Sequence, residues 1–309
     1  MLETLNLYAK GREGLQHDGW LADVERSVIA IFSASPVEAQ PRYVAEVGCG
    51  DGWVLLNVYE TVRQKTPRGK QLTKYPLTLI AADIDRAALD AADRTLAGID
   101  HVLIEAGAGE PERFSEGLRA HAVAAADVLH IRAFADHKRP YGPPGDAGAL
   151  EERRKVGYTG VYVGENEAAI PAAAAVQSLV EHFERWSRLV TPHGLLLVER
   201  HRVAPLLMMD QSDRSESSHA DAPNGSARPL LVEADVALMA AAEAGLFTDR
   251  SQLRSYPPLE PFSRITLNLL KKRGYRVRVA RESDAAALEA LEAASWPAGL
   301  EISCGEIKR

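Results

Sequence analysis

Cysteine is scarce in this chain: its 309 residues include two, Cys49 and Cys304. So few thiols exclude a disulfide framework and a cysteine-based zinc site, and they are typical of a reducing compartment. No apolar run approaches the roughly 18–20 residues of a membrane span, and residues 1–10 lack the apolar segment of a signal peptide. We therefore expect a cytoplasmic protein without a membrane partner.

An excess of positive charge is also missing. The formal net charge is −7, which argues against a nucleic-acid partner. Short basic clusters at 68–74, 138–139, 153–155 and 271–273 are either solvated surface or a docking surface for an acidic partner. Hydrophobic residues make up 46% of the chain and charged residues 26%, so a core of ordinary size can form.

The order of the expected elements predicts the fold class. Apolar strand patterns alternate with helical patterns, which implies βαβ units and a parallel sheet. Two further strands after the fifth repeat resemble a hairpin. This order predicts an α/β fold with the Rossmann-like, seven-stranded sheet of class I S-adenosylmethionine methyltransferases. The strands are expected at 43–47, 77–82, 101–105, 126–131, 195–199, 246–255 and 263–270, and the helices at 53–64, 86–96, from 111, 177–189 and 233–244.

The regions around this core have distinct patterns. Residues 1–40 are amphipathic and predict an N-terminal helical lid, and the core spans 41–275. Residues 142–176 are expected to form a lid insertion, and the polar stretch 205–230 a mobile loop. Residues 276–309, with a strand expected at 275–279 and a helix at 284–294, form either a linker or the start of a following domain.

A glycine-rich loop follows the first expected strand. It reads Glu46-Val-Gly48-Cys49-Gly50-Asp-Gly52, and its glycines let the backbone turn tightly and approach a ligand. In such sheets, ligands lie at the carboxyl ends of the strands. Asp83, at the end of the second strand, is placed to accept from both ribose hydroxyls of a nucleoside. This combination favours S-adenosylmethionine.

Other interpretations of this loop remain open. They are a nicotinamide-binding fold, a tight turn that binds no ligand, and, for Asp83, an N-cap of the following helix. The acidic residue that many methyltransferases have after the third strand is missing at Gly107-Ala108. The remaining predicted cofactor contacts are Ile84, Gly107, Ala108 and Ile131.

The segment after the fourth strand carries the candidate chemistry. It reads His130-Ile-Arg-Ala-Phe-Ala-Asp-His-Lys-Arg-Pro-Tyr141, and the fifth strand ends in Glu199-Arg-His201. Both segments reach the same edge of the sheet. Two imidazoles and a carboxylate suit one divalent metal ion, so Asp136, His137 and His201 are the candidate ligands.

Several chemical roles are possible at this edge. A metal can stabilise an enolate, or a histidine can act as a general base. Arg132 and Arg139 can hold a carboxylate through their planar guanidinium groups. Tyr141 completes the candidate catalytic set with Arg132, His137 and His201. Three roles remain open for Glu199: a general base, a carboxylate that supports a metal ligand, or an ordinary charged residue at a strand end. His130 is expected to be structural.

These segments resemble the carbon-methyltransferase domains of polyketide synthase loading modules, such as those of the apratoxin, gephyronic acid and saxitoxin assembly lines. The resemblance extends through 181–201, 244–247 and 256–267 and covers most of residues 7–275. The tail 276–297 is similar to the start of an acetyltransferase-like decarboxylase domain.

The resemblance implies a substrate and partners. The substrate is malonyl or methylmalonyl on an acyl carrier protein, and the α-carbon receives one or two methyl groups from S-adenosylmethionine. Some family members use a single iron or manganese ion. A third ligand from the loop 217–229 is then limited to His219 or Asp221. The neighbouring partner is the decarboxylase-like domain.

Overall fold

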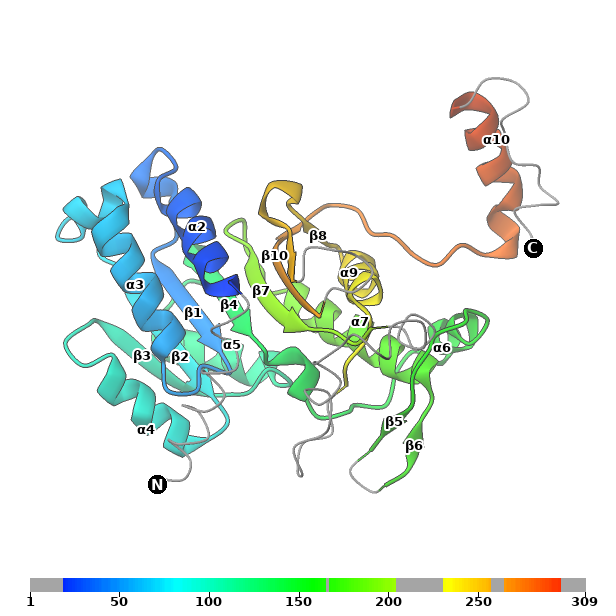
Figure 1. The fold of residues 1–309 in the computed structure, drawn as a ribbon, viewed down its shortest axis with the longest axis horizontal. Helices are drawn as coiled ribbons and strands as arrows, with labels where there is room; N and C mark the ends of the chain where they lie inside the picture. The colour runs from blue at the N-terminus through cyan, green and yellow to red at the C-terminus, as the bar shows by residue number, and fades with distance from the viewer. Residues whose placement is uncertain (1–18, 165–166, 204–229, 257–263, 296–309) are drawn as a thin grey trace, which may run out of the picture.

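A computed structural model describes residues 19–164, 167–203, 230–256 and 264–295 of the protein (Figure 1). Its main sheet contains β1 (Tyr43–Val47), β2 (Thr78–Asp83), β3 (His101–Glu105), β4 (Val128–Ala133), β7 (Leu195–Arg200), β8 (Leu246–Thr248), β9 (Arg254–Tyr256) and β10 (Ile265–Lys272). The helices are α2 (Trp20–Phe32), α3 (Trp53–Lys65), α4 (Arg86–Thr95), α5 (Pro111–Ala120), α6 (Ala147–Arg153), α7 (Ala172–Ser187), α9 (Ala234–Glu243) and α10 (Ala285–Ser295).

The sheet has the order β3-β2-β1-β4-β7-β10-β8, and β9 also pairs with β10. Strands β1, β2, β3, β4 and β7 are parallel, whereas β10 is antiparallel to β7. Because β8 and β9 pair with opposite ends of β10, they share one edge position. The eight strands therefore fill seven positions, and the predicted class I methyltransferase fold is confirmed.

Helices cover both faces of the sheet (Figure 1). The period of two along each strand separates the faces: Leu129 and Ile131 of β4 belong to the core beneath α2, α3 and α4, while Val128 belongs to the core beneath α5 and the end of α7. A third core joins β7 and β10 to α7 and α9. The carboxyl ends of the parallel strands hold the candidate site.

Some boundaries differ from those that the sequence predicts. Residues Ala125–Asp127 form a 3-10 turn, so the fourth strand runs over 128–133 rather than 126–131. Helix α7 begins at Ala172, five residues before the predicted start at 177. The predicted strand at 275–279 is wrong, because the chain there bonds to the end of α9 instead of a strand edge: Val277 N donates to Ala242 O at 3.4 Å.

The expected lid region contains α6 and a small hairpin of β5 (Tyr162–Val163) and β6 (Ala169–Ile170). Its two tyrosines serve packing: Tyr162 donates to Leu231 O at 2.8 Å, and Tyr158 accepts from Arg153 at 2.9 Å. The lid role stays a prediction. Residues 1–18 of the predicted N-terminal lid and residues 205–229 of the mobile loop predicted at 205–230 lie outside the described residues.

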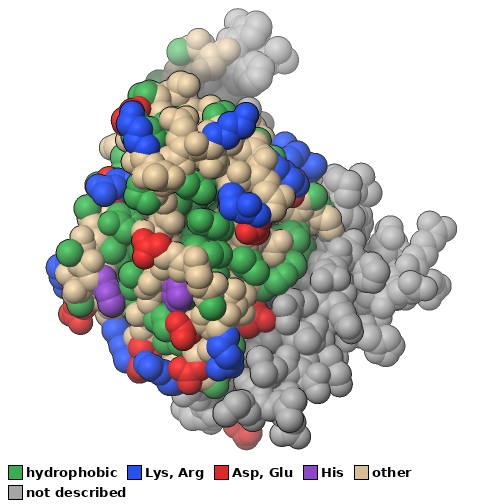
Figure 2. Space-filling model, turned by 90° about the vertical axis from the view of Figure 1, so that its left-hand side faces the viewer, with side chains coloured by type: hydrophobic (Ala, Val, Ile, Leu, Met, Phe, Trp, Pro, Cys, Tyr) green, Lys and Arg blue, Asp and Glu red, His purple; other side chains and the backbone are tan. Residues whose placement is uncertain are grey.

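Helix α10 lies away from the sheet, at the end of an extended segment (Figure 1). None of its described residues belongs to the three hydrophobic cores. Among the helices that the structure describes, none has the length and apolarity needed to cross a membrane. On the face beside α3 and α4, acidic and basic side chains are interspersed around an apolar area (Figure 2).

Candidate active site

The glycine-rich loop has the conformation that its sequence predicts. Gly48 N and Cys49 N both donate to Ala82 O, at 2.8 and 3.0 Å, which ties the loop to β2. Gly48 has a φ of 82°, and a Cβ there would lie 2.9 Å from Ala135 Cβ. Only glycine allows this turn and this close approach. The loop therefore forms one wall of a large cavity together with the turn after β4.

This cavity has a volume of about 990 Å³ and lies at the carboxyl ends of β1, β2 and β4. It is large enough for a nucleoside cofactor together with part of a substrate. The residues that line it include Glu46, Gly48, Cys49, Gly50, Asp83, Ile84, Gly107, Ala108, Glu110, Lys138, Arg139, Tyr141 and His182.

Glu46 offers an unsatisfied acceptor to this cavity. Its carboxyl is buried, and Oε2 has no hydrogen-bond partner in the described structure. Burial, together with the charges of Asp51 and Asp83, raises its pKa. An ammonium group is a suitable partner for such a carboxyl, and the methionine part of S-adenosylmethionine carries one. Burial also raises the pKa of the neighbouring Cys49 thiol, which therefore stays protonated.

Asp83 has the geometry expected for ribose binding. Its two oxygens each accept one backbone N–H at 3.0 Å, from Gly50 and Asp85. A carboxylate has about four acceptor positions, so lone pairs remain for two hydroxyls. The helix cap is a different residue, because Asp85 accepts from Ala87 N at 2.9 Å. The adjacent Ile84 is 60% exposed on the cavity and offers an apolar face to an adenine ring.

The part of the large cavity at the end of β3, where an adenine ring is expected, contains an acidic residue that the sequence pattern did not predict. Glu110 Oε2 accepts from Gly107 N at 3.0 Å, so the loop brings this carboxylate back to the end of β3. Both residues line the cavity with Ala108. Glu110 can thus accept a hydrogen bond from an adenine amino group. It takes the place of the acidic residue that is missing at Gly107-Ala108.

Ile131 does not line the cavity. It is fully buried in the core beneath α2 and α3, since β4 extends two residues further than predicted. Ala133, Phe134 and Ala135 line the cavity instead. Phe134 has a φ of 57° and packs edge-on against Trp20, with ring centroids 5.2 Å apart. A left-handed phenylalanine is strained, and such strain is concentrated at functional sites.

His137 and Glu199 form a buried pair beside this turn. His137 Nδ1 lies 2.5 Å from Glu199 Oε1, and Glu199 Oε2 accepts from the backbone N–H groups of Asp136 and His137 at 2.8 and 3.2 Å. Because a carboxylate only accepts, His137 Nδ1 carries the proton. The lone pair of His137 is therefore on Nε2, the nitrogen that a general base or metal ligand uses.

Asp136 belongs to a different network. Arg132 Nε lies 3.2 Å from Asp136 Oδ2, and His182 Nε2 lies 2.5 Å from Asp136 Oδ1. Burial alone would raise the pKa of Asp136, but Arg132 and His182 lower it to about 2. The guanidinium of Arg132 is fully buried and lies 4.6 Å from the Trp186 ring centroid. Asp136 therefore neutralises a buried cation.

Arg132 was expected to hold a substrate carboxylate, and the structure does not place it there. It lies within β4, facing α7, and lines neither the large cavity nor a smaller cavity beside His201. Arg139 does line both. Arg139 Nη1 donates to Asp136 O at 3.0 Å, and burial lowers the pKa of Arg139 to about 10. Tyr141 lines the large cavity, where burial and Glu181 raise its pKa.

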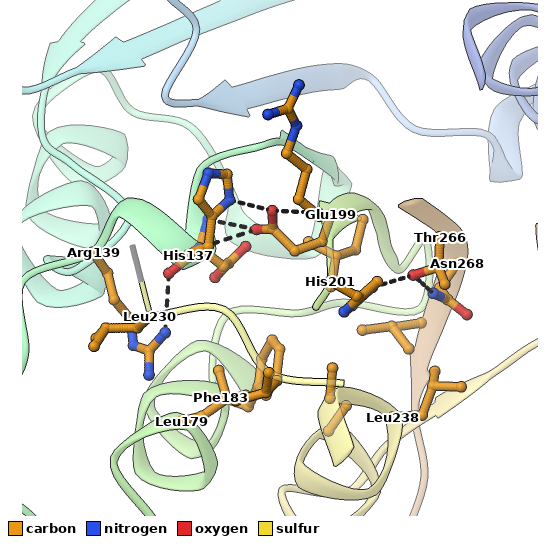
Figure 3. Close-up of a pocket in the computed structure, with 17 residues that line it drawn as sticks. His137, Arg139, Leu179, Phe183, Glu199, His201, Leu230, Leu238, Thr266 and Asn268 are labelled. Carbon is orange, nitrogen blue, oxygen red and sulfur yellow. Dashed lines mark hydrogen bonds and ion pairs between the residues drawn. The ribbon is translucent and has the colours of Figure 1, made fainter. Parts of the chain in front are cut away.

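His201 lies in a second, smaller cavity between β7, β10, α7 and α9 (Figure 3). Its Nε2 is 2.7 Å from Thr266 Oγ1, and its Nδ1 is buried without a hydrogen-bond partner in the described structure. Burial lowers the pKa of His201 to about 4. His137, Arg139 and Glu199 line the same cavity.

The three predicted metal ligands do not form a ready-made metal site. Within the described ranges, no cluster of three or more His, Cys, Asp or Glu side chains has the arrangement of a metal site. Both oxygens of Asp136 face Arg132 and His182, while His201 Nε2 faces Thr266. His219 and Asp221, the proposed sources of a third ligand, lie outside the described residues. In the part of the chain that the structure describes, Asp136, His137 and His201 are therefore not arranged as ligands of the expected iron or manganese ion.

The buried histidines predict an acid-sensitive fold. Burial lowers the pKa of His130 from 6.5 to about 4, and its Nε2 bonds Leu189 O at 3.2 Å, as its expected structural role requires. Between pH 6.5 and 4 the unfolded chain thus binds a proton that the folded chain does not. As the pH is lowered from 6.5 to 4, the free energy of unfolding should therefore decrease, by about 3 kcal/mol for a fully buried histidine.

Denaturant unfolding of the wild type and of His130→Leu from pH 7 to pH 4 measures this effect. Between pH 7 and pH 4, the free energy of unfolding of His130→Leu should decrease less than that of the wild type. The difference should be at most the contribution of one buried histidine, about 3 kcal/mol. His121→Leu, at an exposed position, serves as the control. Equal pH dependence of the wild type and His130→Leu would show that His130 is not held neutral.

Comparisons with known proteins identify the family of this chain. A family model described as the AprA MT2-like domain matches residues 4–268. The comparison with curated proteins gives no significant match.

Similar solved structures include a cyclopropane synthase and two carbon methyltransferases. MmaA2 of Mycobacterium tuberculosis is 10% identical, with a TM-score of 0.42 over 77% of this chain and 63% of that one. The CurJ carbon methyltransferase is 13% identical, with a TM-score of 0.44 over 79% of this chain and 51% of that one. The DszA carbon methyltransferase is 13% identical, with a TM-score of 0.40 over 78% and 49%. The chain spans less than two thirds of each.

The family model covers most of the chain, including the glycine-rich loop, Asp83 and the segment around His137. The carboxyl groups of Glu46, Asp83 and Glu110 line the large cavity at the carboxyl ends of the strands. The chain belongs to the AprA MT2-like methyltransferase family and is an S-adenosylmethionine-dependent methyltransferase.

Proposed function

We propose that this enzyme methylates the α-carbon of a malonyl or methylmalonyl group carried by an acyl carrier protein. The observation that carries this proposal is the His137–Glu199 pair, with Nδ1 and Oε1 2.5 Å apart. Methyl transfer to carbon requires removal of a proton from that carbon, and a histidine held by a carboxylate is suited to this task.

The residues of the site have separable functions. His137 Nε2 takes the α-proton, and the electron pair left on carbon is delocalised onto the thioester oxygen. Glu199 orients the imidazole and stabilises the positive charge that it acquires. Arg139 binds the free carboxylate of the malonyl group, because its buried guanidinium lines both cavities. The proton then passes from His137 to solvent.

Glu46, Asp83 and Glu110 would hold S-adenosylmethionine, which would supply an electrophilic methyl group for the α-carbon and leave as S-adenosylhomocysteine. The expected metal ion has no part in this proposal, because Asp136 and His201 are engaged in other contacts.

The carrier protein and the following domain are also proposals. Lys138 is exposed and lines the large cavity, so it can meet an acidic carrier protein at the mouth of the site. The position of α10 away from the cores fits a segment that leads into an acetyltransferase-like decarboxylase domain.

Mass spectrometry of malonyl-loaded carrier protein, incubated with enzyme and S-adenosylmethionine, tests the proposal. We expect a gain of one or two methyl groups on the acyl group. Methylation of small hydroxylated or aminated acceptors, with none on the malonyl carrier protein, would favour an ordinary O- or N-methyltransferase. Tight cofactor binding with no methyl transfer at all would indicate a domain without catalytic function.

A further inference from the structure

One side of helix α7 forms a wall of the large cavity. The wall consists of Ser178, Glu181, His182 and Arg185, which are three or four positions apart along the helix and therefore project from the same side of it. Glu181 and Arg185 lie about one turn apart, and each is bonded to the backbone of a loop that also lines the cavity. Helix α7 thus holds two loops of the cavity wall at once.

Arg185 holds the loop that follows β3. Its Nη2 donates to Gly109 O at 2.9 Å, and the neighbouring Trp186 Nε1 donates to Ala108 O at 2.7 Å. Residues 107–110 all line the cavity, in the part where an adenine ring is expected. Helix α7 therefore fixes the loop that a bound adenine ring would contact.

Glu181 holds a second loop, residues 140–146. Three of these seven residues are proline and carry no N–H, which leaves four backbone donors. Glu181 accepts from two of the four: Oε2 accepts from Gly145 N at 2.8 Å, and Oε1 accepts from Asp146 N at 3.1 Å. One carboxylate thus fixes the end of this loop at the place where helix α6 begins.

The two loops are in contact with each other. A Cβ on Gly109 would lie 3.3 Å from Pro140 Cδ, so the start of the second loop packs closely on the first. Residues 140–143 line the cavity as well. The loops 107–110 and 140–146 therefore form one continuous piece of the cavity wall, and both are bonded to α7.

Glu181 is itself held from the buried side of α7. Gln177 Nε2 donates to Glu181 Oε1 at 3.1 Å, and Gln177 Oε1 accepts from Arg153 Nε at 2.8 Å. Arg153 is buried, at the end of α6, and forms an ion pair with Glu243 of α9 at 2.5 Å. This chain of contacts fixes the direction of the Glu181 carboxylate, so little freedom is lost when it binds the loop.

We propose that Glu181 is a positioning residue for the cofactor: it holds loop 140–146 against loop 107–110, and the closed wall slows the release of S-adenosylmethionine and S-adenosylhomocysteine. The two bonds to Glu181 are charge-assisted and break when loop 140–146 opens, so they add to the barrier for release. The inference concerns the cofactor alone. It goes beyond the proposed carbon methylation and does not depend on it.

Release of radiolabelled S-adenosylhomocysteine into an excess of the unlabelled compound tests the role of Glu181. Glu181→Gln keeps the shape of the side chain but replaces one acceptor oxygen by an NH2 donor, which then faces a backbone N–H. Release should be about 10-fold faster than from the wild type, the scale of one charge-assisted hydrogen bond. Glu184→Gln is the matched control: Glu184 lies on the same helix, pairs with Arg276 at 2.8 Å and does not line the cavity, so release should be unchanged.

Amide hydrogen exchange at Gly145 and Asp146 shows whether the loop is the cause. In the wild type, S-adenosylhomocysteine should slow this exchange, because a closed loop that retains the ligand must in turn be stabilised by it. In Glu181→Gln the two amides should exchange faster. Release from Glu181→Gln at the wild-type rate, or faster release without faster exchange at these amides, would overturn the inference. So would exchange in the wild type that S-adenosylhomocysteine leaves unchanged.

Discussion

His137→Ala is expected to lower the rate of methyl transfer by about 10²–10⁴-fold, the usual contribution of a positioned general base. Binding of S-adenosylmethionine should stay within a few-fold of wild type, because His137 does not line the cofactor cavity. Single-turnover rates and calorimetric titration with the cofactor measure the two quantities. His121→Ala, on the surface, is the control.

A second variant separates a base from a residue that only supports the fold. Glu199→Gln keeps the shape of the side chain but removes the charge that stabilises protonated His137. The double variant His137→Ala/Glu199→Gln should be no slower than His137→Ala alone, since residues that act as one unit are not additive. If His137→Ala transfers methyl groups at a near-normal rate, the pair is not the base.

Asp136→Ala is expected to destabilise the folded enzyme by about 3–5 kcal/mol, because it leaves a buried guanidinium without its counter-charge. The side chains of Arg132 and Asp136 are 1% and 3% exposed, so water cannot replace the lost partner. Denaturant unfolding at neutral pH measures the loss. Asp127→Ala, which breaks the exposed ion pair with Arg42, should cost only about 0–1 kcal/mol.

Removing the buried cation should restore much of this stability. In Arg132→Met/Asp136→Ala the unpaired charge is gone, so the double variant should be more stable than Asp136→Ala alone. If Asp136→Ala costs less than about 1 kcal/mol, Asp136 has no role in neutralising Arg132.

Local patterns predicted the fold and the cofactor side of the site. The strand before Gly48, the turn that needs glycine, and Asp83 at the end of β2 all lie within short stretches, where residue type and period decide the structure. A shift of two residues in β4 was enough to misplace Ile131 and Arg132. Strand boundaries depend on pairing with neighbours, which a local pattern does not contain.

The chemical side depends on contacts between distant residues. His137 and Glu199 were both expected at the same sheet edge, but they are 62 positions apart and their pairing is visible only in the fold. His182 has the pattern of an ordinary core position of α7, and its partner Asp136 is 46 positions away. Glu110 was not predicted, because it does not directly follow the strand and a loop returns its carboxylate to Gly107.

Carbon–carbon coupling in the product tests the proposed reaction most directly. The enzyme is given S-adenosylmethionine with a ¹³C-labelled methyl group and carrier protein bearing malonyl labelled with ¹³C at the α-carbon. If His137 generates a carbon nucleophile, the transferred methyl carbon will show one-bond coupling to the α-carbon. A labelled methyl group without that coupling would place the transfer on oxygen or nitrogen and contradict carbon methylation.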